Sequence, residues 1–432
     1  MEREGASSNS HLEDMLRKLP VIELDKRIFD RVSDEPDSDE EDRIADEILW
    51  DVILGVPQRD WETAKVTEYN RVFLECALKN AAKYKKDDDD YKKKIEEVNC
   101  TLSDMEKFDY FEILPRSPYP SRFYWWYRVY RMRNTNPTSV RSKRYSDPGA
   151  EEYLESGVLQ FFSMKFSGEF SNGKPMSVYG FVAVRDDVDH LRNYVFNRSR
   201  ENAYEIFPDS ANIPLISPAR GISTEFDVLI EYSIKVKMND SDCAQGDVEL
   251  MDGCFEFIHL DRFYHEVRDV RIYGSLGPVD IHFASLTRGV EACIDVQIKR
   301  TEKGCNNLKV VTAFTSRFPN GIVLYDSSIF SQGTPSKEDG LPLLIIDSSV
   351  VAVELASKLK LLLDVSTEDD PECEFRHQDA NKREVQGTVT THELSFKGKK
   401  YGSSEEAIVI GGMLEVEAKV TWSTMGLPCF KW

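Results

Sequence analysis

The sequence lacks the short motifs by which most enzymes hold a phosphate or activate a nucleophile. Its 432 residues contain no nucleophile elbow, no P-loop and no dinucleotide fingerprint, so acyl, phosphoryl and hydride transfer have no support. The eight cysteines include no CxxC pair, and Cys254, His259 and His265 lack a fourth ligand at a usual zinc spacing. We therefore expect a protein that is not an enzyme and that uses no metal or cofactor.

Long apolar runs are also missing. No run approaches the ~20 residues needed to span a bilayer, and the opening MEREGASSNS has neither an apolar signal core nor an arginine-rich transit pattern. Together with the scattered cysteines, this predicts a reducing cytoplasmic or nuclear setting. The net charge of −21 disfavours nonspecific binding of the whole molecule to nucleic acid or anionic membranes.

Strict alternation of apolar and polar residues marks three strands. In the range 226–238 every even position is apolar and the odd positions are polar apart from Leu229. The ranges 290–298 and 414–422 repeat this period of two. Such a period places one face of a strand against a core and the other face in water, which is typical of antiparallel sheets.

Less regular apolar runs extend the β pattern through the C-terminal two thirds of the chain. No helix-length amphipathic segment separates these runs, which disfavours a parallel βαβ architecture. We predict a mainly β protein, an antiparallel β-sandwich over residues 145–432 that folds on its own. The further runs lie at 159–166, 308–314, 322–325, 343–346, 350–355 and 359–365.

The N-terminal third has a different organisation. Residues 1–60 hold 18 acidic and 8 basic side chains, a composition that cannot bury a core. We predict a disordered acidic tail over 1–42 and a short α-helical segment over 43–115, with helices near 44–52 and 62–84. The DDDDYKKK run at 87–94 is interpreted as a solvated break between helices.

A basic aromatic linker is predicted over residues 116–144. Residues 116–150 carry eight Arg or Lys against Asp147 alone. The stretch FYWWYRVYRMR is interpreted as a strand or linker that docks its aromatic side chains, and its alternative role is to stack RNA bases and hold phosphates. An extended stretch would point neighbouring tryptophans to opposite faces. The candidate binding residues are Arg122, Trp125, Trp126, Arg128 and Arg131.

Polar residues at fixed offsets lie among the strands between residues 178 and 237. They indicate a structural framework rather than an active site, and we expect Arg198 and Arg220 to pair with carboxylates such as Asp186 or Glu231. The structural motif comprises Asp186, Asp189, Arg192, Asn193, Asn197, Arg198, Arg220 and Glu231.

Two loops have simple structural interpretations and a functional alternative each. Asp186, Asp187 and Asp189 follow a strand and are interpreted as a turn whose carboxylates cap backbone N–H groups, although such carboxylates can also collect Ca²⁺. The range 274–277 has the two glycines of an RNA-clamping loop but no flanking helices. It is predicted to be a hairpin turn.

The order of these motifs resembles a plant family of unknown function that is expanded in grasses. That family forms the C-terminal part of some cereal jasmonate-induced ribosome-inactivating proteins, and the resemblance covers about residues 145–422. One departure is Ser217, where the family often has Gly before Pro, so the turn there is expected to differ. The matching positions are 178–180, 182–186, 189, 192–193, 196–198, 200, 218–220, 231–237 and 290–292.

The resemblance implies an all-β module without an assigned activity, plausibly in a plant stress or defence response. A ribosome-inactivating N-glycosidase would need a helical Glu-Ala-Ala-Arg, and the nearest match, Glu291 to Ile294, has Ile in place of Arg and lies in an alternating strand. We therefore expect a non-catalytic binding or regulatory module with an unidentified protein partner. The alternatives are an RNA- or ribosome-associated protein and a glycosidase relative without the toxin site.

Overall fold

The computed structural model shows a mainly β protein with antiparallel sheets and little helix, so the predicted fold class is confirmed. The predicted acidic tail and the helices expected near 44–52 and 62–84 lie almost wholly outside the described residues. The structure describes residues 83, 86–116, 125–149, 155–238, 246–258, 266–300, 306–328, 334–338, 341–367, 388–411 and 414–425.

The chain divides into two compact units. One unit comprises residues 1–94 and 113–134, and the other comprises residues 95–112 and 135–432. The second unit contains every strand within the part of the chain that the structure describes, and it includes residues 135–144, which the sequence pattern assigned to a linker. No helix in the described ranges is long and apolar enough to cross a membrane.

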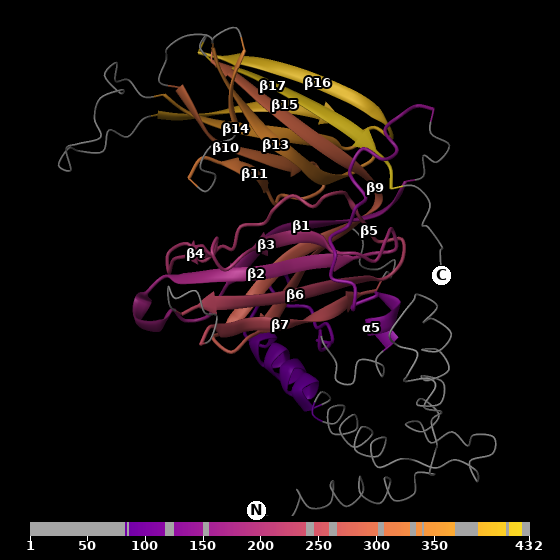
Figure 1. Ribbon diagram of the computed structural model, residues 1–432, viewed down its shortest axis with the longest axis vertical. Coiled ribbons are helices and arrows are strands. Elements are labelled where there is room, and N and C mark those ends of the chain that lie inside the picture. The colour runs from indigo at the N-terminus through magenta and orange to yellow at the C-terminus, as the bar shows by residue number, and fades with distance from the viewer. Residues whose placement is uncertain are drawn as a thin grey trace, which may run out of the picture. The chain divides into compact units, whose positions relative to one another are not determined.

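The seventeen strands of the described residues form three sheets (Figure 1). One has the order β12-β13-β9-β1-β5, with β8, β16 and β17 attached, the second has the order β3-β2-β6-β7 with β4, and the third has the order β11-β10-β14-β15. The strands are β1 (Ser156–Phe166), β2 (Met176–Arg185), β3 (Asn193–Arg198), β4 (Tyr204–Ile206), β5 (Ile222–Ser223), β6 (Val228–Lys237), β7 (Val248–Phe257), β8 (Val267–Tyr273), β9 (Pro278–Arg300), β10 (Asn306–Thr315), β11 (Ile322–Asp326), β12 (Thr334–Glu338), β13 (Leu341–Glu354), β14 (Lys358–Thr367), β15 (Thr388–Lys397), β16 (Gly402–Ile410) and β17 (Leu414–Ser423).

The long strand β9 connects two groups of strands in the second unit. Its first half pairs with β8 and β1, and its second half pairs with β13 and β17. Each half therefore lies in a different group of strands (Figure 1). The predicted hairpin turn at 274–277 is confirmed, since it joins β8 to β9 and Gly274 N–H donates to Gly277 O.

The first core is an aromatic cluster from β1, β6, β7 and β9. Phe283 packs against Phe161, Phe255 and Phe257, with ring centroids 5.6–6.2 Å apart. Phe111 enters the same cluster, 5.3 Å from Phe255, although it precedes the first strand by more than forty residues. Residues before the predicted β-sandwich thus help to fill its core.

The second core is aliphatic and lies between the β9-β13-β17 layer and the β11-β10-β14-β15 sheet. Alternate residues of β9, β14 and β17 point into it, as their spacing predicts. Its fully buried members include Val290, Ala292, Leu359, Leu361, Leu363, Val365, Val416, Val420 and Trp422. Two sheets packed face to face in this way form a sandwich.

The three strands predicted from alternation are confirmed as β6, β9 and β17. The polar face of β6, however, is mostly buried rather than exposed to solvent. Leu229, Glu231 and Ser233 are buried like their apolar neighbours, and only Lys235 is exposed. The physical reason is that buried arginines pair with the Glu231 carboxylate. This polar side of β6 leads to the ion pairs described below.

Gly180 in the Val-Tyr-Gly motif has a steric role. Its φ of +122° is a conformation that side-chain-bearing residues rarely adopt, and a Cβ there would lie 2.1 Å from the Ser233 carbonyl oxygen. Glycine therefore allows β2 to approach β6 closely, where Gly180 pairs with Ile234.

The acidic and basic run at 87–94 is helical, so the predicted break is wrong. Residues 86–99 form a helix in which Tyr91 and Ile95, four residues apart, are both buried. The run also places each aspartate of 88–90 four residues before a lysine, the spacing and orientation that favour a helix. Charge patterning and one apolar stripe outweigh the low propensity of aspartate.

The aromatic stretch is helical as well, so the extended strand or linker expected there is wrong for the described residues. Trp125–Val129 form the short helix α5. Trp126 and Tyr130, four residues apart, are 5% and 2% exposed, and Tyr130 N–H donates to Trp126 O. A helical period accounts for this pair, whereas strand alternation does not.

Candidate functional site

The motif residues of β2, β3 and β6 form a buried network of ion pairs. Arg220 donates from both terminal nitrogens to the two oxygens of Asp186, each at 2.6 Å, and from Nη2 to Asp189 at 3.0 Å. Arg220 is 2% exposed and Asp186 is fully buried. Although burial opposes its charge, the Asp186 and Asp189 carboxylates raise the pKa of the Arg220 guanidinium. This bidentate geometry is the strong form of the pair.

Two further arginines hold the Glu231 carboxylate on β6. Arg185 Nε donates to Glu231 at 2.9 Å, and Arg192 donates through Nε and Nη2 at 3.0 and 2.5 Å. Burial raises the Glu231 pKa, but hydrogen bonds and charges from the two arginines outweigh it and lower the pKa. Arg192 also stacks its guanidinium 4.2 Å from the Phe181 ring centre.

Backbone contacts complete the network around the loop that carries Arg220. The Asn193 side chain donates to Arg220 O and accepts from Ala219 N–H, both at 2.9 Å. Glu291 on β9 accepts from the N–H groups of Lys143 and Gly221, at 2.7 and 2.6 Å. Burial raises the Glu291 pKa despite these donors. The polar groups at the end of β2 therefore support the backbone of neighbouring loops.

The segment 135–146 lies along this network. Thr138 N–H donates to Arg192 O, Arg192 N–H donates to Asn136 O, and the Thr138 hydroxyl donates to Asp189. Tyr145 N–H donates to the Ser423 hydroxyl at 2.8 Å, and Ser146 O accepts from Gly402 N–H. This strap (residues 135–146) thus ties β3 and the β2–β3 loop to β16 and β17.

The structure brings most of the predicted motif together but separates part of it. Asn197 is exposed, and Arg198 is half-buried with no ion pair to a carboxylate in the described ranges. Asp186 and Asp189 cap the N–H groups of Val188 and Leu191, as expected for a charged turn. Within the described residues no group of three or more His, Cys, Asp or Glu side chains is arranged around a potential metal position.

The pKa of the Asp187 carboxyl in this loop is strongly raised. Burial and the neighbouring Asp186 charge raise it from 3.8 to about 6, and its Oδ1 has no hydrogen-bond partner in the described part of the chain. A folded-state pKa above the unfolded value means that the native state binds this proton more tightly. Its contribution to stability is therefore full below about pH 4 and is lost as the pH rises to about 6.

We expect Asp187→Asn to remove this pH dependence. Relative to the variant, the wild type should lose up to about 3 kcal/mol of unfolding free energy between pH 4 and pH 6.5, because the shift is about two units. Urea unfolding at pH steps across this window measures the difference. Asp209→Asn, at an exposed position, is the control and should follow the wild-type profile. Parallel profiles for wild type and Asp187→Asn would show that Asp187 ionises normally.

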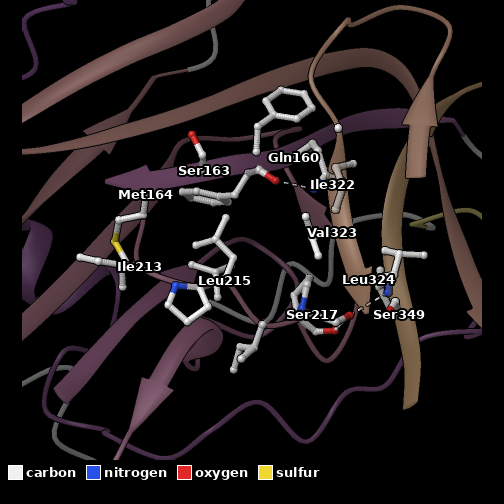
Figure 2. A pocket seen from close by; sticks show the side chains of 18 of the residues that line it. Gln160, Ser163, Met164, Ile213, Leu215, Ser217, Ile322, Val323, Leu324 and Ser349 are labelled. Carbon is white, nitrogen blue, oxygen red and sulfur yellow. Dashed lines mark hydrogen bonds between the residues drawn. The ribbon is translucent and has the colours of Figure 1, made fainter. Parts of the chain in front are cut away.

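A pocket of about 690 Å³ lies beside the network, within the second unit. Its walls come from β1, the loop 210–222, β11 and β13. Figure 2 shows Gln160 and Met164 on one side, Leu215 on the loop and Leu324 on the facing strand. The apolar lining residues include Leu159, Phe161, Met164, Val195, Ile213, Pro214, Leu215, Ile216, Ile222, Ile322, Val323, Leu324 and Val350.

Two side chains hold the facing walls of the pocket together. Gln160 on β1 accepts from Ala352 N–H at 2.8 Å, and Ser217 on the loop accepts from Val350 N–H at 2.7 Å (Figure 2). Both acceptors bind backbone donors of β13, so the width of the pocket depends on them. Ser217 thus supplies a hydroxyl that a glycine at this turn would lack.

The remaining polar lining residues include the uncharged Ser163, Tyr204, Ser210 and Asn212, and a second set on β11 and β13 contains both charged residues. Asp326 and Ser328 lie at the end of β11, and Asp347, Ser348 and Ser349 lie on β13. Asp347 is exposed and Asp326 is half-buried, whereas Leu159 and Met164 at the other side are buried. The pocket therefore has an apolar interior and a polar, negatively charged rim.

The predicted binding residues of the basic aromatic segment belong to the other compact unit. Arg122 and the side chains of Trp125 and Arg128 lie outside the described residues. Trp126 is buried and Arg131 is exposed with a φ of 48°. A buried Trp126 offers no free ring face for base stacking, and the RNA alternative stays an untested prediction.

A family model matches residues 158–418, which contain the buried ion pairs of the network, the lining residues of the pocket and most of both apolar cores. The chain belongs to the family described as Domain of unknown function (DUF6598). The resemblance seen in the sequence is confirmed to that extent. The family description adds no activity, and none of the curated proteins matches the chain.

Similar solved structures include human GIVD cytosolic phospholipase A2, alone and in complex with methyl gamma-linolenyl fluorophosphonate. Both are 8% identical, with TM-scores of 0.19 and 0.18, and cover 65% and 63% of this chain. This DUF6598 chain spans about a third of their length, 33% and 32%. At these TM-scores the likeness carries no argument about fold or function.

The sequence patterns did not identify the pocket. Its lining residues come from six separate segments of the chain, and most of the apolar ones have the pattern of ordinary strand core. One signal was present in the run NIPLISP at 212–218, where apolar residues stand between prolines and do not alternate. Such residues are exposed or half-buried in a loop unless another element covers them.

Proposed function

We propose that this DUF6598 chain is a non-catalytic binding module whose pocket holds a small molecule with an apolar body. The observation that carries the proposal is the size and lining of the pocket. Its volume of about 690 Å³ falls within the usual range for small-molecule sites, which are mostly apolar with a few convergent polar groups.

The chemistry of the lining supports binding rather than catalysis. Its described residues include no histidine, cysteine, lysine or arginine, so the lining offers no imidazole or amine to activate a hydroxyl such as that of Ser217. Ser217 instead accepts Val350 N–H and donates to Pro218 O. The ion pairs of Glu231 with Arg185 and Arg192 are buried, and we assign these three residues to the scaffold.

The biological setting of this activity is part of the proposal. The resemblance of the motif order to a grass-expanded family supports a role in plant stress or defence. In that role the module would regulate a protein partner when it has bound its ligand. The pocket walls, joined through Gln160 and Ser217, would transmit the change between the empty and the ligand-bound pocket to the surface.

The proposal predicts saturable binding of the neutral apolar dye Nile red to the full chain. Leu215→Trp adds a large side chain to the pocket lining and should weaken dye binding at least about tenfold, because the ligand would lose apolar burial. Dye fluorescence titration measures the change. Val389→Trp, at an exposed position of β15, is the matched control and should bind like the wild type. Equal affinity of all three proteins, or no saturable binding, would place the apolar surface elsewhere.

A further inference from the structure

The charged residues at the rim of the pocket bear on the charge of the ligand. Asp326 on β11 and Asp347 on β13 are the two charged lining residues in the described part of the chain, and both are acidic. We propose, on the basis of the proposed function, that the natural ligand is an amphipathic cation. Its apolar body enters between β1 and the 210–222 loop, and its amine lies at the rim beside these carboxylates.

Asp347 is available for such a contact. Its side chain is exposed and forms no ion pair or hydrogen bond with the described residues. Asp326 is half-buried and uses Oδ1 to accept the N–H and hydroxyl of Ser328, at 2.8 and 2.6 Å. Its second oxygen faces no described donor. One free carboxylate and one partly used carboxylate therefore line the same pocket.

Hydroxyl groups complete the polar rim. Ser217, Ser328 and Ser349 line the pocket on the same loop and strands. A primary ammonium group has three donors and no acceptor, so it matches carboxylate and hydroxyl oxygens. A carboxylate or phosphate head group would instead face two like charges at the rim.

The charge of the whole molecule acts in the same direction. A net charge of −21 attracts cations and repels anions before contact, and this steering adds to the local preference. An apolar body is still required, because an exposed carboxylate alone binds an amine weakly in water. The pocket interior supplies that part of the affinity.

Displacement of Nile red by dodecylamine, dodecanol and dodecanoate, each below its micellar concentration, tests this inference. The three probes share one apolar chain and differ in head-group charge. We expect dodecylamine to displace the dye at a concentration at least about tenfold lower than dodecanoate, with dodecanol between them. Asp347→Asn and Asp326→Asn should reduce this preference severalfold and leave dodecanol unchanged. Glu415→Gln, which removes a carboxylate of β17 outside the pocket, is the charge-matched control and should keep the wild-type order.

The outcomes separate the two proposals. Equal displacement by the three probes, unchanged in both aspartate variants, overturns the cationic ligand but keeps the pocket as a binding site. A preference for dodecanoate also overturns it. Failure of dye and probes to bind overturns the proposed function itself. Circular dichroism of each variant verifies that these rim substitutions leave the fold intact.

Discussion

Replacing Arg220 by alanine is expected to lower the free energy of unfolding by about 3–5 kcal/mol. The substitution leaves the Asp186 carboxylate fully buried without its bidentate partner and removes a contact to Asp189. An uncompensated buried charge costs far more than the net strength of the pair. Urea unfolding at pH 7, where the carboxylate is ionised in the unfolded chain, measures the loss.

Arg198→Ala is the matched control for this experiment. Arg198 carries the same charge on the adjacent strand β3 but pairs with no carboxylate in the described ranges, so its loss should cost less than about 1 kcal/mol. A loss for Arg220→Ala no larger than for Arg198→Ala would contradict the assignment of a buried network. A large loss limited to Arg220 supports it.

The second large effect concerns where the folded domain begins. The fragment 145–432, which the strand pattern alone predicts to fold independently, is expected to be at least about 3 kcal/mol less stable than the fragment 86–432. It lacks Phe111, which packs in the aromatic core, and burial of a phenylalanine contributes on this scale. It also lacks the Thr138 and Lys143 donors to Asp189 and Glu291.

Chemical unfolding of both fragments, followed by tyrosine and tryptophan fluorescence, compares them directly. Phe111→Ala in the longer fragment separates the loss of core packing from the loss of the strap. We expect this variant to lie between the two fragments. Identical unfolding midpoints for 145–432 and 86–432 would contradict this, because they would show that residues 86–144 add no stability to the core.

The strands were predictable from the sequence because burial on a sheet has a period of two. The ranges 290–298 and 414–422 have clear alternation, and they lie in β9 and β17 with their apolar residues in one core. The runs 343–346 and 350–355 read as two strands but form the single strand β13, with an irregularity between Ile346 and Ser349. Local pattern does not reveal pairing across such a bulge.

The polar face of β6 marks the limit of this reasoning. Alternation predicts solvent at Glu231, but Arg185 and Arg192 arrive from other strands and bury it. The helix at 86–99 and α5 differ from expectation for a related reason, because Tyr91 with Ile95 and Trp126 with Tyr130 are helical pairs embedded in charged sequence. Their burial depends on tertiary contacts that composition does not show.

The candidate site was only partly accessible to sequence reasoning. Asp186, Arg192, Arg220 and Glu231 stood out as a motif, and the structure places them in ion pairs that hold loops and strands together. The pocket is built from residues that stand out in no motif, such as Leu159, Leu215 and Leu324. Motif residues of this chain thus identify its scaffold, and the proposed binding pocket follows from how that scaffold places ordinary apolar side chains.

A methyl NMR titration of the full chain with dodecylamine tests the central claim most directly. The account predicts saturable shifts of methyl resonances in the pocket, such as those of Ile213, Leu215 and Ile322. The chemical shifts of methyl groups in the aliphatic core, such as those of Leu361 and Val416, should not change. Shifts confined to another surface, or none at concentrations that displace Nile red, would contradict the claim that this pocket binds the ligand.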